Sequence, residues 1–261
     1  MTNKLPFPVF RFKPRTTSKI PGASIIVLQE WWGVNNQCKQ HAQRLADDTG
    51  AHTVIPDLYK GKVGVDAEEA SHLMKNLDWR NAISELQQLT LQLHEAKYPS
   101  VGSIGFCMGG GLSLALASHL ATASKYPLKA CVSCYGTPPG DLYDVRDITT
   151  VTPVQGHFGG KDTMKGFSDP EAADALEFNL RIHKTAESII YRYPEQGHAF
   201  MNDEEWSIEQ RKNLGFVDKT SDPKVTEQQV RELAWSRINS FFVQHLSNRQ
   251  QSVESLDKPL G

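Results

Sequence analysis

A cysteine flanked by glycines is the residue of this 261-residue chain that is best placed for covalent chemistry. Cys107 stands in the sequence Gly-Phe-Cys-Met-Gly, after an apolar run and before a stretch of small and apolar residues. This pattern is typical of a strand–turn–helix nucleophile elbow, with cysteine in place of the usual serine. A helix N-terminus also favours a thiolate or an oxyanion, because its first amides are unpaired. A structural cysteine is the alternative, whereas a phosphate loop is disfavoured because no Lys-Ser/Thr follows the glycines.

An acid and a histidine follow two later predicted strands. Asp162 comes directly after a Gly-Gly-Lys turn, and His198 lies in the segment behind the last predicted strand. In open α/β sheets, catalytic groups gather beyond the carboxyl ends of the strands. The order along the chain is nucleophile, acid and histidine, which is the order found in α/β-hydrolases. We therefore expect Cys107, Asp162 and His198 to form a catalytic triad.

Other side chains are alternative candidates for the histidine and for the acid of this triad. His157 precedes the acid and lies inside a predicted strand, so we interpret it as a packing residue. Asp162 is the preferred acid because it lies within a short turn of its strand. Three alternative acids follow the preceding strand: Asp141, Asp144 and Asp147.

Glu30 also follows a predicted strand and is adjacent to Trp31 and Trp32. A glutamate buried at a strand end is costly unless it is paired or used. Here it could share a cleft with Cys107, where its negative charge would oppose ionisation of the thiol. The alternative is a partly exposed surface carboxylate beside two core tryptophans.

Apolar runs alternate with helical patterns along the chain, which predicts the α/β class: a mostly parallel sheet with helices on both faces. We expect one domain over residues 1–261, with a polar, frayed tail at 248–261. The predicted strands are Phe7–Phe12, Ser24–Gln29, Ala51–Ile55, Val101–Phe106, Lys129–Tyr135, Thr152–Phe158 and Ser188–Tyr193. The predicted helices are Asn36–Asp48, Asp66–Asn76, Trp79–Ala96, Gly109–Ala123, Pro170–Lys184 and Thr226–Leu246. The last helix should pack an apolar stripe on the sheet, made of Val230, Leu233, Ile238, Phe241 and Phe242.

Composition and charge narrow the classes of partner. Hydrophobic residues make up 39% and charged residues 22% of the chain, and the formal net charge is −2. This balance gives no electrostatic reason to expect nucleic acid or an anionic membrane as a partner. No apolar run approaches the ~20 residues of a spanning helix. Metal-ligand spacings are missing too, so we expect no metal and no cofactor.

Cysteine content and the N-terminal segment bear on the compartment. Four cysteines are too few for a disulfide scaffold, and Cys131 and Cys134 fall in an apolar run, which indicates a structural role. A reducing, cytoplasmic location is therefore expected. The first 29 residues lack Asp and Glu, a faint transit-peptide feature, but the predicted strand at Phe7–Phe12 favours an entry into the domain.

With these residues in place, the chain resembles the dienelactone hydrolase family (carboxymethylenebutenolidase-like) of the α/β-hydrolase superfamily. The resemblance implies an α/β-hydrolase fold and hydrolysis of a small-molecule lactone or carboxylic ester. The segments that carry it span most of the chain: Gln29–Asn35, Pro56–Tyr59, Gly105–Gly110, Gly159–Asp162 and Gly197–Phe200.

The resemblance also implies roles for individual residues. Cys107 would be the nucleophile that forms a thioester, His198 its base, and Asp162 the group that orients His198. Glu30 would hold the resting thiol by a hydrogen bond and help to ionise it when substrate arrives. The backbone amides of Met108 and Trp31 would form the oxyanion hole.

Substrate contacts are expected from Trp32, Phe200 and Asn202. In the family that the chain resembles, two arginines grip a substrate carboxylate. This chain has Asn202 at one of these positions and no arginine in the helix expected at residues 66–75, so the anion clamp is not expected. The two tryptophans favour an apolar pocket mouth instead. We expect a monomer or a homodimer.

Two other classes of protein are alternatives to an ester or lactone hydrolase. An amidotransferase-like or glyoxalase-type protein also has an elbow cysteine and an upstream glutamate, but it needs a histidine soon after the elbow helix, for which His119 is the candidate. A non-catalytic or thiol-sensing binding protein on the same scaffold is the remaining alternative.

Overall fold

A seven-stranded sheet forms the centre of the molecule in the computed structural model, which describes residues 4–182 and 186–247. The predicted frayed tail at 248–261 and the predicted helix end at Lys184 lie outside the described residues. The strand order is β1-β3-β2-β4-β5-β6-β7. The strands are β1 (Val9–Phe12), β2 (Ala23–Leu28), β3 (His52–Pro56), β4 (Ser100–Phe106), β5 (Ala130–Cys134), β6 (Val154–Gly159) and β7 (Ser188–Tyr193).

The pairing of the strands confirms the mostly parallel sheet. Every pair of neighbouring strands from β3 to β7 is parallel. Among the described strands, only β1, at the edge of the sheet, pairs antiparallel, and its partner is β3. The strands inside the sheet are buried along their whole length: β2, β3, β4, β5 and β6. Strands covered on both faces require continuous apolar runs, which is why the sequence showed runs rather than alternation.

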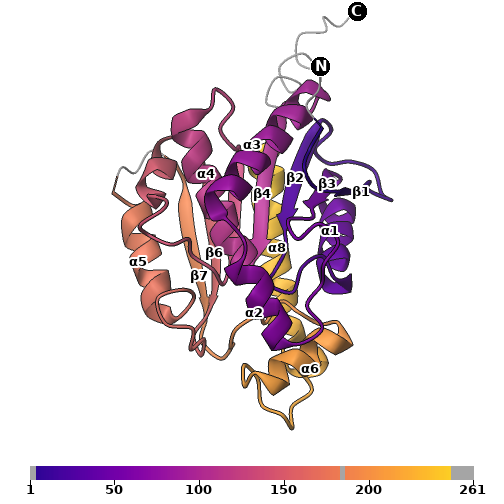
Figure 1. Ribbon diagram of the computed structural model, residues 1–261, viewed down its shortest axis with the longest axis vertical. Helices are drawn as coiled ribbons and strands as arrows, with labels where there is room; N and C mark the ends of the chain where they lie inside the picture. Colours follow the sequence, from indigo (N-terminus) through magenta and orange to yellow (C-terminus); the bar gives the residue numbers. More distant parts are fainter. Residues whose placement is uncertain (1–3, 183–185, 248–261) are drawn as a thin grey trace, which may run out of the picture.

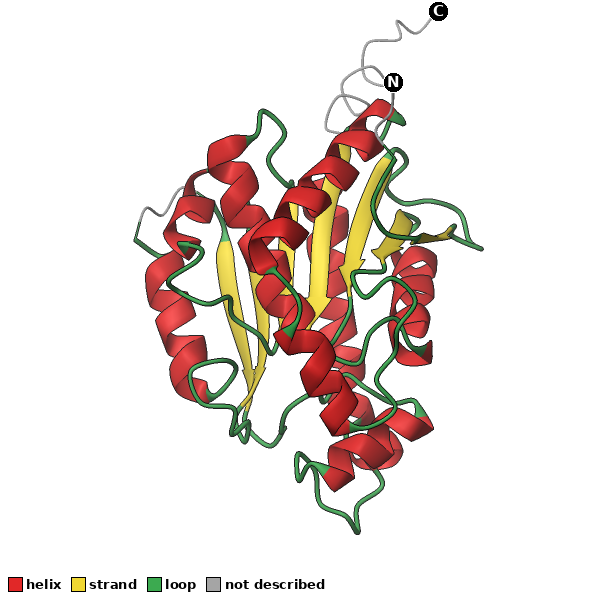
Figure 2. Ribbon diagram, in the orientation of Figure 1, coloured by secondary structure: helices red, strands yellow, loops and turns green. Residues whose placement is uncertain are grey.

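The helices form two layers, one on each face of the sheet (Figures 1 and 2). Helices α3, α4 and α5 contact one face, and α1 and α8 contact the other. Figure 1 shows α6 at the lower end of the molecule. The helices are α1 (Asn36–Thr49), α2 (Ala67–Lys75), α3 (Trp79–Glu95), α4 (Met108–Ala123), α5 (Pro170–Leu180), α6 (Glu205–Asn213), α7 (Pro223–Thr226) and α8 (Gln228–Leu246), with a 3₁₀ turn η1 (Val145–Thr150).

Side-chain caps explain where several helices begin. Asn35 accepts a hydrogen bond from the amide of Cys38 at the start of α1, and Asp66 accepts one from Glu69 at the start of α2. Short polar side chains at the N-cap satisfy amides that the helix leaves unpaired. These signals lie within one residue of the helix starts expected from the sequence.

The apolar stripe predicted for the last helix, α8, is wrong at one residue. Leu233 is 47% exposed and does not belong to the buried stripe. At about 100° per residue, the face that contains Ile238 and Phe242 contains Ala234 and Trp235 rather than Leu233. Both of these residues are almost fully buried against the sheet.

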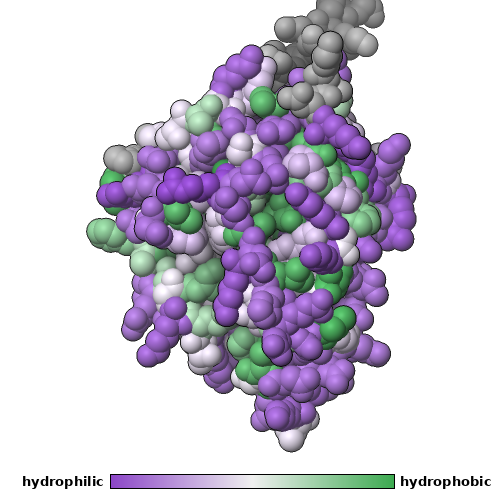
Figure 3. All heavy atoms as spheres, in the orientation of Figure 1, coloured by the Kyte–Doolittle hydropathy of each residue, from purple (hydrophilic) through white to green (hydrophobic). Residues whose placement is uncertain are grey.

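The space-filling view shows one face of the molecule that is largely hydrophilic, with apolar atoms in small separate groups (Figure 3). No helix within the described ranges is long and apolar enough to cross a membrane.

Candidate active site

The turn between β4 and α4 holds Cys107 in an unusual backbone conformation. Its φ is 53° and its ψ is −120°, outside the regions that a side-chain-bearing residue normally adopts. Helix α4 begins at the next residue without any side-chain cap. The Cys107 amide is fixed by a 3.0 Å hydrogen bond to the carbonyl of Cys134 on β5. Strain of this kind persists where the surrounding structure holds it, and it is common at functional sites.

Glycines make this turn possible because backbone segments lie too close for a Cβ. A Cβ on Gly105 would lie 1.8 Å from the carbonyl oxygen of Gly109. A Cβ on Gly109 would lie 2.3 Å from the carbonyl oxygen of Leu28, at the end of β2. The two glycines that flank the turn in the sequence therefore have a steric role, as the elbow pattern predicted.

His198 and Asp162 are directly hydrogen bonded. Nδ1 of His198 lies 2.7 Å from Oδ2 of Asp162, and both residues are buried. The amide of Met164 donates to the same carboxylate at 3.0 Å. The hydroxyl of Ser168 lies 3.1 Å from Nδ1. Asp162 is thus the acid that the structure places beside His198.

Burial and charge shift the pKa values of this pair in opposite directions. Burial alone would raise the pKa of Asp162, but the hydrogen bond and charge of His198 outweigh it and lower that pKa. Burial alone would lower the pKa of His198, but the charge of a Cys107 thiolate and the Asp162 hydrogen bond raise it to about 10. The surroundings therefore favour a charged imidazole next to a charged carboxylate.

Cys107 and His198 line the same small cavity. Nε2 of His198 makes no hydrogen bond of good geometry within the described residues, but the Cys107 sulfur interacts with the imidazole and raises its pKa, so this nitrogen is available to the thiol or a substrate. The volume of the cavity is about 10 Å³, roughly the room that one water needs. Its lining consists of Glu30, Trp31, Trp32, Cys107, His198, Ala199, Asn202, Ser207, Gln210, Arg211, Leu214 and Phe216.

Glu30 is buried at the cavity and is held by Asn202. The Asn202 side-chain amide donates to both carboxylate oxygens, at 3.1 and 3.0 Å. Burial raises the pKa of Glu30, and the Asn202 hydrogen bond offsets part of this effect. No hydrogen bond joins Glu30 to the thiol of Cys107 in the described part of the chain, so the resting partner of Glu30 is Asn202.

The expected substrate contacts and oxyanion donors fall into two groups. Trp31, Trp32 and Asn202 line the cavity, whereas Met108, as the first residue of α4, provides an amide that the helix leaves unpaired. Phe200 does not reach the cavity. Its ring is fully buried and packs 4.9 Å from that of Tyr193, so the expectation of a substrate contact is replaced by a place in the core.

Several residues at the site were missed in the sequence. Ser168 lies six residues after Asp162, in a loop without a recognisable motif. Tyr135 directly follows β5, and its ring lies 5.2 Å from the His198 imidazole. The ring of Phe216 lies 4.9 Å from the same imidazole on a loop after α6. Only Tyr135 had a usable signal, because it stands at the carboxyl end of a strand next to the elbow.

Arg211 on α6 was also missed, and it ties this helix to the histidine loop. Its Nε donates to the carbonyl of His198 at 3.2 Å. Its guanidinium bonds both carboxylate oxygens of Glu227, at 2.7 and 2.9 Å. Arg211 and Glu227 are both buried, and the polar α6 segment is thereby fixed over the cavity.

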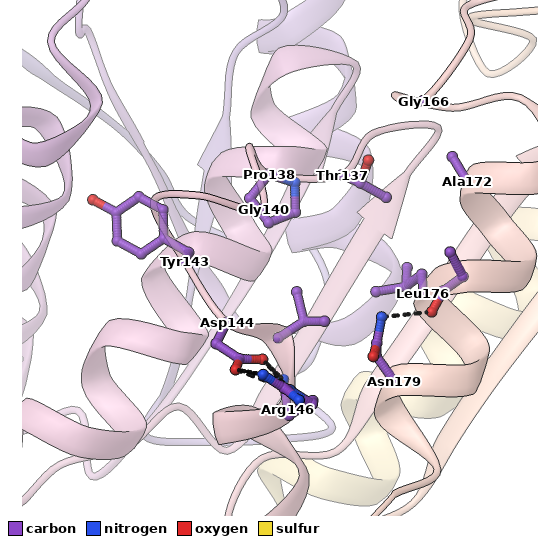
Figure 4. Close-up of a pocket in the computed structure, with 12 residues that line it drawn as sticks. Thr137, Pro138, Gly140, Tyr143, Asp144, Arg146, Gly166, Ala172, Leu176 and Asn179 are labelled. Carbon is purple, nitrogen blue, oxygen red and sulfur yellow. Dashed lines mark hydrogen bonds and ion pairs between the residues drawn. The ribbon is translucent and has the colours of Figure 1, made fainter.

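The alternative acids and histidines lie elsewhere. Asp144 caps η1 and pairs with Arg146 at the edge of a separate cavity of about 340 Å³ (Figure 4). His157 is buried in the sheet between Gln155 and Tyr193, and burial lowers its pKa to about 3. His119 on α4 lies 3.0 Å from Gln87 on α3. None of these side chains lines the cavity of Cys107. In the described ranges, no three His, Cys, Asp or Glu side chains are grouped as metal ligands.

The sheet, the two helical layers and the elbow define the α/β-hydrolase fold. A solved structure described as a dienelactone hydrolase-like promiscuous phosphotriesterase from metagenomic libraries shares this arrangement. It matches with a TM-score of 0.64 and 21% identity, over 89% of this chain and 87% of that chain.

The family follows from the sequence comparison. A model of the dienelactone hydrolase family matches residues 7–246, and the chain belongs to this family of ester and lactone hydrolases. It is 28% identical to Protein usf of Aquifex pyrophilus, over 88% of this chain and 92% of that protein. It is 27% identical to the carboxymethylenebutenolidase of Rhodococcus opacus, over 69% of this chain and 71% of that protein.

Proposed function

We propose that this protein hydrolyses a carboxylic ester or lactone, with Cys107 as nucleophile, His198 as base and Asp162 as the carboxylate that orients His198. The geometry of His198 carries the proposal. Nδ1 is held 2.7 Å from Asp162, while Nε2 makes no hydrogen bond of good geometry among the described residues and belongs to the cavity that Cys107 lines. An imidazole that is held at one nitrogen and open at the other suits a group that gives a proton to the leaving alkoxide and then, as base, takes one from water.

The reaction has two steps that pass through a thioester. The Cys107 thiolate attacks the carbonyl carbon, and the amides of Met108 and Trp31 bind the resulting oxyanion. Collapse breaks the ester C–O bond, and the departing alkoxide takes a proton from Nε2 of His198. Water then attacks the thioester, His198 accepts its proton, and the thiolate departs with release of the acid. One oxyanion donor is worth about 3 kcal/mol in such reactions.

Glu30 has a separate role in this proposal. Its pKa is raised by burial, which favours the protonated form and suits a group that takes up a proton. We assign to Glu30 the uptake of the Cys107 proton when substrate enters. A nucleophile that must remain a thiol also fits a reducing compartment.

The charges around the cavity favour a substrate without a carboxylate of its own. Apart from His198, Arg211 is the lining cation among the described residues, and Glu227 and two backbone carbonyls already occupy its guanidinium. The buried Glu30 would repel a second anion. Trp31 and Trp32 provide apolar contacts instead, and we propose a neutral acyl group. The carboxymethylenebutenolidase name of the Rhodococcus relative supports an ester or lactone bond as the target.

Replacement of the nucleophile tests the proposal. Cys107→Ala should lower kcat for 4-nitrophenyl butyrate at least about 1,000-fold, because the covalent route is removed. Mass spectrometry of the quenched wild-type reaction should find the acyl group on the peptide that contains Cys107. Cys38→Ala is the control, since this buried cysteine on α1 does not line the cavity, and its kcat should stay near that of the wild type.

Two outcomes would contradict the proposal. Retained turnover in Cys107→Ala rejects the nucleophile, and an acyl adduct on another residue rejects the thioester. In the same assay, an otherwise similar ester with a terminal carboxylate on the acyl chain should react more slowly. Faster turnover of that anionic ester would reject the neutral acyl group while leaving the nucleophile in place.

A further inference from the structure

The cavity around Cys107 is too small for an ester. Its volume of about 10 Å³ is roughly the room that one water needs, whereas pockets for small organic ligands measure about 300 Å³ or more. A wall of the cavity must therefore move before an acyl group can reach the thiol. The wall that moves decides which esters the enzyme can use.

Phe216 separates this cavity from a much larger pocket at the surface, here called the outer pocket. The outer pocket has a volume of about 510 Å³, and its lining includes Gly197, Phe216 and Asp218. In the described part of the chain, Phe216 is the one residue that lines both the outer pocket and the catalytic cavity. Its side chain is half-buried, and its ring meets the His198 imidazole edge-on at 4.9 Å and 64°.

The backbone of Phe216 is held in place at the end of α6. Gly215 has a φ of 74°, and its amide donates to the carbonyl of Lys212 at 3.2 Å. The Phe216 amide donates to the carbonyl of Arg211 at 2.9 Å. These bonds and the left-handed glycine form a Schellman motif, which ends a helix in a defined geometry. The carbonyl oxygen of Phe216 also packs against Gly197, where a Cβ would approach it to 2.1 Å.

Several other walls of the cavity are tied to their neighbours. Trp32 is buried, and its ring packs 4.8 Å from that of Trp31 and 5.0 Å from that of Trp206. Asn202 is bonded to both carboxylate oxygens of Glu30. In contrast, the phenyl ring of Phe216 makes no hydrogen bond, and the outer pocket beside it has room for the ring. Rotation about the side-chain bonds of Phe216, between staggered positions, is therefore the movement that breaks the fewest contacts.

We propose that Phe216 is the residue that determines which substrates reach Cys107, because its ring turns from the catalytic cavity into the outer pocket to admit them. This inference rests on the proposed function, since an ester must reach the thiol for the reaction to occur. The space that the ring vacates lies beside His198 and receives the ester. The size of the side chain at position 216 thus sets the width of substrate that can enter.

The charges of the outer pocket favour an uncharged substrate on this route. Lys161 and Glu195 form an ion pair of 2.5 Å and offset each other. Glu227 is likewise paired with Arg211. The exposed Asp218 therefore leaves the entrance with a net negative charge, which disfavours the approach of an anion.

Two thiol reagents of different width measure the opening directly. Maleimide and N-(1-pyrenyl)maleimide attack the same thiolate, so the ratio of their rate constants with Cys107 cancels any change in ionisation of the thiol. Mass spectrometry of the peptide that contains Cys107 follows both reactions. In Phe216→Ala the ratio of the wide to the narrow reagent should rise at least about 10-fold over that of the wild type, because the obstructing ring is gone. The kcat/KM for fluorescein dibutyrate relative to that for 4-nitrophenyl butyrate should rise with it.

Phe216→Leu keeps an apolar side chain and should raise the same ratio by a smaller factor, which preserves the test if Phe216→Ala folds poorly. Phe167→Ala is the matched control. The Phe167 ring also lies near the His198 imidazole, at 6.4 Å, but it lines a different pocket and not the catalytic cavity. The ratio in Phe167→Ala should equal that of the wild type.

Reversal of the charge at the entrance tests the route. In Asp218→Lys, the rate constant of Cys107 with the anion iodoacetate, divided by that with neutral iodoacetamide, should rise about 2- to 4-fold at low salt. Asp141→Lys is the control, because Asp141 is also exposed but does not line the outer pocket. It changes the net charge of the protein equally and should leave this second ratio near that of the wild type.

Three results would overturn the inference. An unchanged wide-to-narrow ratio in both Phe216 variants would show that another wall opens. An equal rise in Phe167→Ala would show that the reagents arrive from the opposite side of the imidazole. Equal iodoacetate-to-iodoacetamide ratios in the two lysine variants would show that the outer pocket is not the route. The proposed function fails on a separate result, retained turnover in Cys107→Ala, on which the alkylation ratios do not depend.

Discussion

Cys107 stands where the backbone is strained and the surrounding segments leave no room for side chains. The carbonyl of Gly109 blocks a Cβ at Gly105, and the carbonyl of Leu28 blocks one at Gly109. The same closeness directs the start of α4, with its unpaired amides, toward the sulfur. The same tight turn therefore explains both the reactivity of Cys107 and the close packing of the backbone around it.

Gly105→Ala should therefore prevent formation of the native turn. A Cβ only 1.8 Å from a backbone oxygen forces the elbow apart, and we expect insoluble protein or a loss of several kcal/mol in the free energy of unfolding. Gly140→Ala is the control, since no atom lies within 4 Å of a Cβ there. Urea denaturation and soluble yield measure both variants. Equal stability of the two proteins would contradict this account of the turn.

At the scale of the elements, the strands and most helices could be predicted, while α6 could not. The strands are apolar runs bounded by turns, and α1, α2 and α5 start at capping residues that the sequence displays. Helix α6 has few apolar residues, and it is held by the ion pair between Arg211 and Glu227, which are sixteen residues apart. Local patterns do not reveal such a pair.

The candidate site likewise has residues whose positions could be predicted from the sequence and others whose positions could not. Asp162 and His198 follow strands of a parallel sheet, so topology alone predicts their proximity. Ser168 and Phe216 reach the imidazole from irregular loops, and Asn202 reaches Glu30 across 172 positions of the chain. Their positions depend on side-chain packing that no periodicity encodes.

Arg211→Met should destabilise the protein by about 3–5 kcal/mol, because Glu227 is left buried beside a weaker partner. Arg231 approaches Glu227 only at 3.4 Å and cannot replace the two shorter bonds. Lys224→Met is the control, since its pair with Glu205 is on the surface and is worth under about 1 kcal/mol. Urea denaturation compares the two variants. A loss in Arg211→Met no larger than that in Lys224→Met would show that the buried pair does not secure α6.

Across the whole molecule, an imidazole held between the Cys107 thiolate and the Asp162 carboxylate makes stability depend on pH. The folded-state pKa of His198 is raised from an ordinary value near 6.5 to about 10. The resulting stabilisation is fully present below pH 6.5 and is lost as the pH rises toward 10. The folded-state pKa of Asp162 is lowered, so its contribution is present above its ordinary value near 3.8 and is lost only as the solution becomes more acidic.

We therefore expect the free energy of unfolding of the wild type to fall relative to that of His198→Gln between pH 6.5 and 9.5. The change should be on the order of 2 kcal/mol. Urea denaturation at several pH values measures it, and the comparison with His198→Gln isolates the contribution of the imidazole together with the groups whose pKa values depend on its charge. A difference that stays constant with pH would show that the imidazole is not held in its charged form.

The small volume of the cavity around the Cys107 sulfur limits which molecules can reach this thiol. Room for one water admits neither glutathione nor a large peroxide, so reaction of the thiol with molecules of that size requires the walls to separate first. Molecules that are too wide for that transient opening are rejected before any bond is broken, and catalysis can proceed no faster than the opening itself.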